Sequence, residues 1–433
     1  MILDFSASNF KSIKNTQTIS FNVEGNDPTH PGNLIERELR SEKFTLLRTA
    51  VIYGANASGK TNVLKALEVM VDMILNSIDN KPDNPIAQHS PFRFNKTFFE
   101  SPTKLEIEFI ADDQIRYNYS FSFNGEKVIQ EALLYFPKGQ KRTLFVRDED
   151  SQFKYGDDFK TPKKAIEDVL LPSQLFFSKA AISNHPLIVP LYKYFNRNFL
   201  FNMEPQPTEW QDPYLSTYLY KNRGDNFRTI FDALLSTADS SISKTEIIDF
   251  SESNTQLPSD SSLSEEENFT NKHFSAIHHD IVGSDGYNIL PLFMESRGTR
   301  KMYDLAGKFI EALEKGMLIC IDELDSSLHP MLSQMIFEIF QNPKINRNNA
   351  QLLVSTHDAT LLTPQTFRRD QVWFTEKDKA GSTELYSLDQ FGGDKVRSTS
   401  KFGDWYLSGR FGALPRIPRT IISRLENAKI TKT

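Results

Sequence analysis

The sequence contains a single cysteine, Cys320, in 433 residues. An intrachain disulfide is therefore excluded, and such low cysteine usage is typical of a reducing compartment. No stretch approaches the roughly 18 consecutive apolar residues of a membrane-spanning helix. The first residues also lack the basic segment, apolar run and cleavage site of a signal peptide. We therefore expect a cytoplasmic protein without a membrane partner.

Excess positive charge is also missing, because the formal net charge is −6 at pH 7. A basic field over the whole surface is thus excluded, and any contact with nucleic acid would need a local patch. The sequence has neither an internal repeat nor a heptad run long enough for a coiled-coil arm. Its length suits one large domain with insertions, or two domains.

A glycine-rich segment lies between a predicted strand and a predicted helix. Residues 46–53 form an apolar, partly β-branched run that predicts a buried strand. In residues 61–78, apolar side chains recur every three or four positions, which predicts one face of a helix. Between them, residues 54–61 read GANASGKT and match the phosphate-binding pattern G-x-x-x-x-G-K-[ST]. The alternative, a chance glycine-rich turn, is disfavoured by this strand-loop-helix context.

This pattern assigns roles to the groups of the loop. Its backbone N–H groups and the helix N-terminus are expected to bind the phosphates of ATP. The Lys60 ammonium is expected to bridge the β- and γ-phosphates as a catalytic group, and the Thr61 hydroxyl to bind Mg²⁺. The predicted ATP-binding residues are Asn56, Ala57, Ser58, Gly59, Lys60, Thr61 and Asn62.

Two further apolar runs end in polar residues. Residues 317–321 lead directly into Asp322, which is expected to hold Mg²⁺, and Glu323, the predicted general base for the attacking water. Residues 351–355 lead to a polar cluster with His357, which we expect to hydrogen-bond the γ-phosphate. The alternatives are a solvated acidic turn for the first run and a structural histidine for the second.

A fourth segment, residues 295–301 (ESRGTRK), precedes a predicted helix. Ser296 suits the N-cap position, and a Ser-x-Gly loop at a helix N-terminus is also a phosphate-binding device. Ser296 and Gly298 therefore either bind phosphate or form an ordinary capping turn.

In this order, the four motifs resemble those of the ABC/SMC/RecF-like ATPases. The resemblance implies an α/β fold: a P-loop ATPase head of the ABC/SMC type, with a β-rich N-terminal lobe and an inserted, mainly helical arm. It implies that His357 is the switch histidine and that Asp325 lies in the D-loop. It also implies a head-to-head homodimer or larger homo-oligomer, in which Ser296 and Gly298 contact the γ-phosphate of the partner subunit.

Three details qualify the resemblance. The opening SNFKSI resembles the family's N-terminal strand and turn, which places Lys11 and Ser12 near the nucleotide. The second glycine of the usual signature is absent, and Gln88 is only a weak candidate for a Q-loop glutamine.

The motifs and patterns together predict the domain organisation. Residues 1–160 and 285–385 form a split ATPase head, and residues 161–284 form the helical arm with a mobile loop at 251–270. Residues 386–433 form a C-terminal segment, whose basic residues either contact a partner or nucleic acid or are simply solvated.

Local patterns add detail. Residues 1–21 suit a hairpin, residues 24–43 a loop, and residues 104–155 alternating strands with a turn at Asn124-Gly125. The run His278-His279-Asp280 could bind a metal, although adjacent strand residues point in different directions.

A narrower resemblance concerns function. The segments that carry it are PFRF (91–94), ESRGT (295–299), DELDSSLHP (322–330), STHD (355–358) and LSGRFGALP (407–415). Together they resemble the RloA/AbiLi-type ATPases and the ATPase subunits of Septu and PARIS phage-defence systems. This implies an ATPase sensor or scaffold that controls a separate effector of the nuclease or toprim type. The alternative is a RecF-like DNA-repair ATPase that binds DNA in an ATP-dependent way; a transporter subunit is disfavoured by the long insertion between the motifs.

Overall fold

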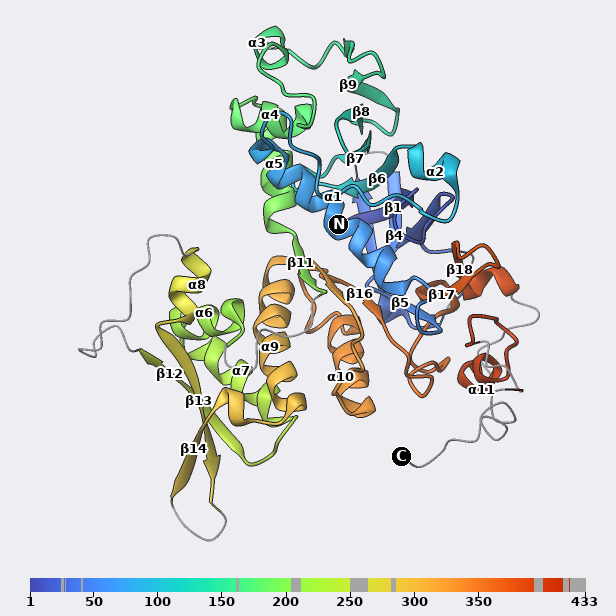
Figure 1. Cartoon of the computed structure of the whole chain (residues 1–433). Helices are drawn as coiled ribbons and strands as arrows, with labels where there is room; N and C mark the ends of the chain where they lie inside the picture. The colour runs from blue at the N-terminus through green and yellow to red at the C-terminus, as the bar shows by residue number, and fades with distance from the viewer. Residues whose placement is uncertain are drawn as a thin grey trace, which may run out of the picture.

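The structure is a computed structural model. It describes the chain except for residues 25–26, 28, 40–41, 161–162, 204–211, 250–263, 282–285, 393–399, 416–419 and 421–433. The predicted α/β fold is confirmed, with two large sheets in the body and a smaller sheet beside α9 (Figure 1). None of the helices in the described ranges is long and apolar enough to cross a membrane.

A six-stranded sheet forms the centre of the body. Its order is β11-β15-β16-β5-β17-β18, and all neighbours are parallel except β17 and β18. Successive side chains of a strand point to opposite faces, so Ala50 and Ile52 join one core while Val51 and Tyr53 join another. The strands are β5 (Thr49–Gly54), β11 (Phe199–Asn202), β15 (Leu318–Ile321), β16 (Gln351–Ser355), β17 (Val372–Lys377) and β18 (Thr383–Ser387).

Helices cover both faces of this sheet. The predicted helix is confirmed as α1 (Lys60–Asn76), whose apolar face shares a core with Ile52. On the other face lie α9 (Arg297–Lys315) and α10 (Pro330–Gln341). Every strand of the sheet except edge strand β18 therefore runs in one direction between helical layers, as is usual for a parallel sheet.

A seven-stranded antiparallel sheet packs on the core of α1. Its order is β10-β9-β8-β7-β6-β1-β2, and the alternating residues Leu105, Ile107 and Phe109 are fully buried. The predicted hairpin of residues 1–21 and the strands of residues 104–155 are thus confirmed. The strands are β1 (Ile2–Ser8), β2 (Gln17–Ser20), β6 (Thr103–Ile110), β7 (Arg116–Phe123), β8 (Val128–Phe136), β9 (Arg142–Arg147) and β10 (Phe153–Tyr155). Short helices α2 (Lys96–Glu100), α3 (Lys164–Glu167), α4 (Phe176–Ile182) and α5 (Ile188–Arg197) border this lobe.

The arm contains a three-stranded antiparallel sheet, which the sequence did not predict. Its order is β12-β13-β14, with β12 (Ile242–Asp249), β13 (His273–Asp280) and β14 (Tyr287–Pro291). Helices α6 (Tyr214–Asn222) and α7 (Asp225–Ser236) contact α9, and α8 (Glu265–Thr270) lies beside α6 (Figure 1).

Two boundaries differ from the prediction. Strand β11 belongs to the central sheet, and α4 and α5 pack in the core of α1, so residues 163–203 are part of the body rather than of the arm. Within the predicted loop 251–270, residues 250–263 lie outside the described residues, whereas α8 occupies most of the rest. Short elements of this kind lack the length that makes periodicity readable.

The predicted loop at residues 24–43 is wrong in its second half. Strands β3 (Leu34–Leu39) and β4 (Glu42–Leu47) form an antiparallel pair that buries Ile35 and Leu46 in a small core. The predicted strand 46–53 is accordingly divided at Arg48, whose guanidinium donates to the carbonyls of Gly32 and Asn346 at 3.0 and 3.1 Å.

The C-terminal segment packs on the central sheet. After α11 (Phe402–Leu407), Phe411 is buried beside Phe374 of β17, and its carbonyl accepts from the Tyr386 hydroxyl at 2.7 Å. The Arg410 guanidinium lies 4.6 Å from the Trp405 ring, and Arg416 and Arg419 lie outside the described residues. The GRFG part of this segment is therefore anchored to its own chain.

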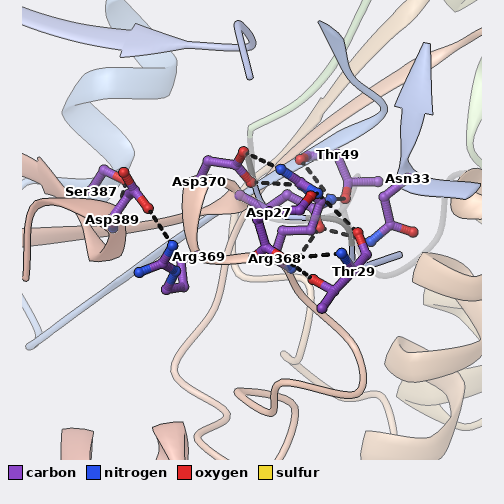
Figure 2. A network of polar contacts seen from close by, with 10 residues as sticks. Asp27, Thr29, Asn33, Thr49, Arg368, Arg369, Asp370, Ser387 and Asp389 are labelled. Atoms are coloured by element: carbon purple, nitrogen blue, oxygen red, sulfur yellow. Dashed lines mark hydrogen bonds and ion pairs between the residues drawn. The ribbon is translucent and has the colours of Figure 1, made fainter. Parts of the chain in front are cut away.

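A buried polar network fixes the N-terminal ends of β5 and β17 (Figure 2). The Arg368 guanidinium makes two hydrogen bonds to the Asp370 carboxylate, at 3.0 and 2.8 Å, and others to backbone carbonyls of Asp27 and Thr29. The exposed fractions of the two charged side chains are 0% and 3%. Beside them, Gln371 donates to the Thr49 hydroxyl. This network joins the chain before β3 to the central sheet.

Candidate functional site

The predicted phosphate-binding loop follows β5 at the C-terminal edge of the central sheet. The loop approaches its neighbours so closely that side chains are excluded at both glycines. A Cβ on Gly59, where φ is +112°, would lie 2.1 Å from the Thr383 hydroxyl, and one on Gly54 would lie 2.4 Å from the Thr375 hydroxyl. Ala57 also has a positive φ, of 62°. These positive φ values curve the backbone of the loop, an arrangement in which successive N–H groups can point toward a bound anion.

A chain of hydroxyl groups holds this loop in place. The Thr383 hydroxyl donates to the Ser58 carbonyl at 2.8 Å and lies 2.7 Å from the Ser12 hydroxyl. The Asn62 amide donates to Ser12 at 2.6 Å, and the Ser58 hydroxyl lies 2.6 Å from that of Thr375. Ser12 therefore contacts the loop, while the expected position of Lys11 and Ser12 near the nucleotide stays a prediction. The Asn62 side chain is engaged in supporting the loop.

Lys60 lies inside the loop, only 5% exposed. Its ammonium donates to the carbonyls of Gly54 and Ala55 at 3.0 and 3.3 Å and lies 3.0 Å from His357 Nε2. Burial lowers the pKa of Lys60, and burial followed by the Lys60 charge lowers the pKa of His357. The neutral imidazole therefore accepts a hydrogen bond from the charged amine.

The two predicted Mg²⁺ residues are in contact. The Thr61 hydroxyl donates to Asp322 Oδ2 at 2.7 Å, and Ser355 at the end of β16 donates to the other carboxylate oxygen. The Asp322 N–H donates to the Asn202 carbonyl at the end of β11. A hydroxyl and a carboxylate beside a phosphate-binding loop are the ligands that Mg²⁺ uses with nucleotides. The residues present therefore fit a Mg²⁺ ion.

Glu323 has a constrained backbone and an exposed side chain. Its φ is +48°, and its N–H donates to the Ser355 hydroxyl at 2.9 Å. Among the described residues, none makes a hydrogen bond to its carboxylate. Asp325 accepts from the His357 N–H at 3.2 Å with both oxygens. The structure thus brings Lys60, Thr61, Asp322, Glu323, Asp325 and His357 into one cluster, while their predicted roles stay predictions.

Ser296 and Gly298 lie at the beginning of α9. The exposed Ser296 side chain accepts from the Thr299 N–H at 3.1 Å, so the capping interpretation holds within the chain. A Cβ on Gly298 would lie 2.8 Å from the carbonyl of Ser327, which follows the Walker B acids, Asp322 and Glu323, in the chain. In the part of the chain that the structure describes, neither residue makes a hydrogen bond to the chain's own phosphate-binding loop.

Two weaker candidates are not part of the site. Gln88 donates to Asp72, which is three turns along α1 from Thr61, so the Q-loop suggestion is wrong for this residue. His278 contacts Glu246 and His279 contacts Glu295, and the described residues contain no metal-ligating cluster. The metal suggestion for His278, His279 and Asp280 is therefore unsupported, because neighbouring strand residues point to opposite faces.

Several supporting residues were missed. Ser355 has a signal in the sequence, because it is a polar residue at the end of an apolar run, as Asp322 is. Asn202 has the same signal at the end of β11, but its strand was not recognised. Thr375 and Thr383 carry no motif, because their role depends on strand pairing between β5, β17 and β18.

Comparisons with known proteins identify a family for most of the chain. Residues 50–363 match the family model described as "AAA domain, putative AbiEii toxin, Type IV TA system". No curated protein matches the chain.

Among solved structures, the SMC head domain from Thermotoga maritima is similar at 12% identity, covering 89% of this chain and 98% of that chain, with a TM-score of 0.38. The recombination mediator protein RecF bound to ATPrS is similar at 13% identity over 89% and 98% of the two chains (TM-score 0.37). cbiO1 from Clostridium perfringens, part of the ABC transporter complex cbiONQ, is similar at 10% identity over 99% and 100% (TM-score 0.34).

The family match covers well over half of the chain and includes the phosphate-binding loop from β5 onward, both Walker B acids and His357. The chain therefore belongs to this AAA-domain family.

Proposed function

We propose that this chain binds ATP and Mg²⁺ and hydrolyses the γ-phosphate bond. The observation that carries the proposal is the 2.7 Å contact between Thr61 and Asp322, residues 261 positions apart. It joins the phosphate-binding loop to the acids after β15, as a nucleotide site requires. Bound Mg²⁺ would neutralise the charge that develops on the phosphates.

The chain's own groups divide the remaining work. The Ser58 and Asn62 N–H groups donate to the carbonyls of Ala55 and Gly59, and the other N–H groups of residues 56–62 bind phosphate oxygens. Lys60 turns its ammonium from the Gly54 carbonyl toward these oxygens. The Glu323 carboxylate, free of hydrogen bonds to the described residues, accepts the proton of the attacking water. Once Lys60 has turned to the phosphates, the neutral His357 ring donates an N–H to the γ-phosphate.

The active form is a head-to-head homodimer or a larger homo-oligomer. Ser296 is exposed at the N-terminus of a 19-residue helix, where backbone N–H groups and the helix dipole favour an anion. Ser296 and Gly298 of one subunit would contact the ATP of the partner, with Asp325 beside the shared interface.

In the cell, the chain acts as the sensor or scaffold subunit of an anti-phage system and controls a separate nuclease- or toprim-type effector in the cytoplasm. Support comes from the RloA/AbiLi-like segments and from the family description, which names a toxin and a TA system. ATP binding would hold the assembly together, and hydrolysis would release it.

The test compares the wild type with Glu323→Gln, measuring ATP turnover and mass in solution with ATP and Mg²⁺. The expected loss in kcat is about 10²- to 10⁴-fold, the range for a general base, with an ATP-bound dimer accumulating. Glu338→Gln, an exposed site on α10, is the matched control and should behave as wild type. If neither wild type nor variant binds ATP, the ATPase proposal is wrong.

A second measurement addresses the role in the cell. Co-purification of a nuclease-type protein with the ATP-bound form supports the defence assignment. ATP-dependent DNA binding that weakens steeply with salt, without such a partner, would replace it with a RecF-like repair function.

A further inference from the structure

Helix α9 rests directly on the loop that contains the general base. Its first turn contacts this loop at Gly298, where a Cβ would lie 2.8 Å from the Ser327 carbonyl. Its second turn contacts the loop at Lys301, whose ammonium donates to the Glu323 carbonyl at 2.6 Å. Helix α9, whose N-cap is Ser296, therefore contacts the loop of Glu323 at two successive turns.

Lys301 lies in an acidic and half-buried environment. The charged groups that face it are Glu323 and Asp325 of the loop, Asp322 before them, and Asp304 one turn further along α9. Burial lowers the pKa of Lys301 to about 8, although these carboxylates oppose the shift. The surrounding groups thus hold the Lys301 amine in a site that is partly removed from water. Such burial is unusual for a lysine that has no structural or functional role.

The left-handed backbone conformation of Glu323 depends on hydrogen-bond partners such as Lys301. A left-handed conformation at a residue other than glycine costs about 1–3 kcal/mol and persists where surrounding contacts enforce it. At Glu323 these contacts are the Ser355 hydroxyl on the N–H, and the Ser326 N–H and the Lys301 ammonium on the carbonyl. Lys301 is the one that comes from α9.

We propose that Lys301 is the positioning residue of Glu323, which it holds in the conformation that presents the carboxylate to the attacking water. Because Lys301 lies on the helix that begins at Ser296, contact of Ser296 with a partner subunit's nucleotide aligns this chain's own general base. The inference rests on the proposed ATPase function and adds a link between the two sites of the dimer.

The test compares Lys301→Met with Lys315→Met, which removes a lysine from the last turn of the same helix, where its exposed ammonium pairs with Glu311. For Lys301→Met we expect kcat to fall about 10- to 100-fold, the cost of a small misplacement of a catalytic group. KM for ATP, ATP affinity and the thermal midpoint should remain near those of the control. Lys301→Arg retains a cationic donor and should recover most of kcat.

A double variant separates positioning from folding. If Lys301 acts through Glu323, adding Lys301→Met to Glu323→Gln should cause no further loss in kcat, since groups acting as a unit are non-additive. Unchanged kcat in Lys301→Met overturns the inference while leaving the ATPase function intact. A loss of ATP affinity and of thermal stability together would overturn it too, because Lys301 would then be a structural tether. Absence of turnover in the wild type would overturn the ATPase function itself.

Discussion

Strand β5 has a polar cluster at each end, and the two clusters are built in opposite ways. At its N-terminal end, the Arg368–Asp370 pair is enclosed and each charge is matched by hydrogen bonds (Figure 2). At its C-terminal end, Thr61 and Glu323 are exposed.

The two ends of this six-residue strand therefore differ in role: the N-terminal cluster serves stability, and the C-terminal cluster serves the proposed function. In parallel sheets, ligands bind at the carboxyl ends of the strands. In the N-terminal cluster, the charges of Arg368 and Asp370 are paired with each other and are not available to a ligand. In the C-terminal cluster, the buried Lys60 amine and the exposed Glu323 carboxylate can contact a ligand. Substitutions at the two ends should therefore affect different measurements.

The largest expected effect is a loss of unfolding free energy on substitution in the cluster at the N-terminal end of β5. Asp370→Ala leaves the Arg368 charge buried without its partner, and removal of one member of a buried pair costs about 3–5 kcal/mol of unfolding free energy. Denaturant unfolding measures this loss, while kcat per folded molecule should stay near wild type. Asp389→Ala breaks the more exposed Arg369–Asp389 pair and serves as control, with an expected loss below about 1 kcal/mol. Equal losses in both variants would contradict the comparison.

The next effect is expected at the C-terminal end. Lys60→Met removes a charged donor from the phosphate site, which is worth about 3 kcal/mol, or a roughly 100-fold rise in the Kd for ATP. Equilibrium binding measures this change, and unfolding free energy should change little. Lys65→Met, one turn along α1, loses only a partly exposed pair with Glu68 and should bind ATP normally. Normal ATP affinity in Lys60→Met would remove Lys60 from the site.

The smallest effect tests the hydroxyl chain beneath the loop. Thr383→Val deletes the hydrogen bonds to Ser12 and Ser58, and we expect a roughly 5-fold rise in the Kd for ATP, about 1 kcal/mol. Thr366→Val deletes a comparable hydroxyl contact, with Thr363, and should leave ATP affinity unchanged. If both variants bind ATP as wild type does, the chain of hydroxyls is a feature of stability alone.

The sequence predicted the parts of the site that have their own local pattern. The P-loop lies between a clear strand and a clear helix, and the Walker B acids and His357 each follow an apolar run, so their convergence followed from the geometry of a parallel sheet. The role of Ser296 stays a prediction, because it depends on a second subunit.

The parts that were missed depend on distant partners. Strand β11 has four residues, and it pairs with β15, more than a hundred positions later. Thr383 supports the loop only because β18 pairs with β17, and Lys301 reaches Glu323 only because α9 packs beside β15. Non-local pairing of this kind leaves no periodic trace in the sequence.

The strand order has a consequence for the synthesis of the protein. Strand β5, with its phosphate-binding loop, is made early, but its neighbours β16 and β17 begin at residues 351 and 372. At about 5–20 residues per second, the ribosome needs roughly 15 to 60 s to supply them. During that time, six residues that are fully buried in the finished molecule have no strand to pair with. The nascent chain thus carries its phosphate-binding segment before the rest of the site exists, and protection of this segment from aggregation must come from elsewhere until β16 and β17 emerge.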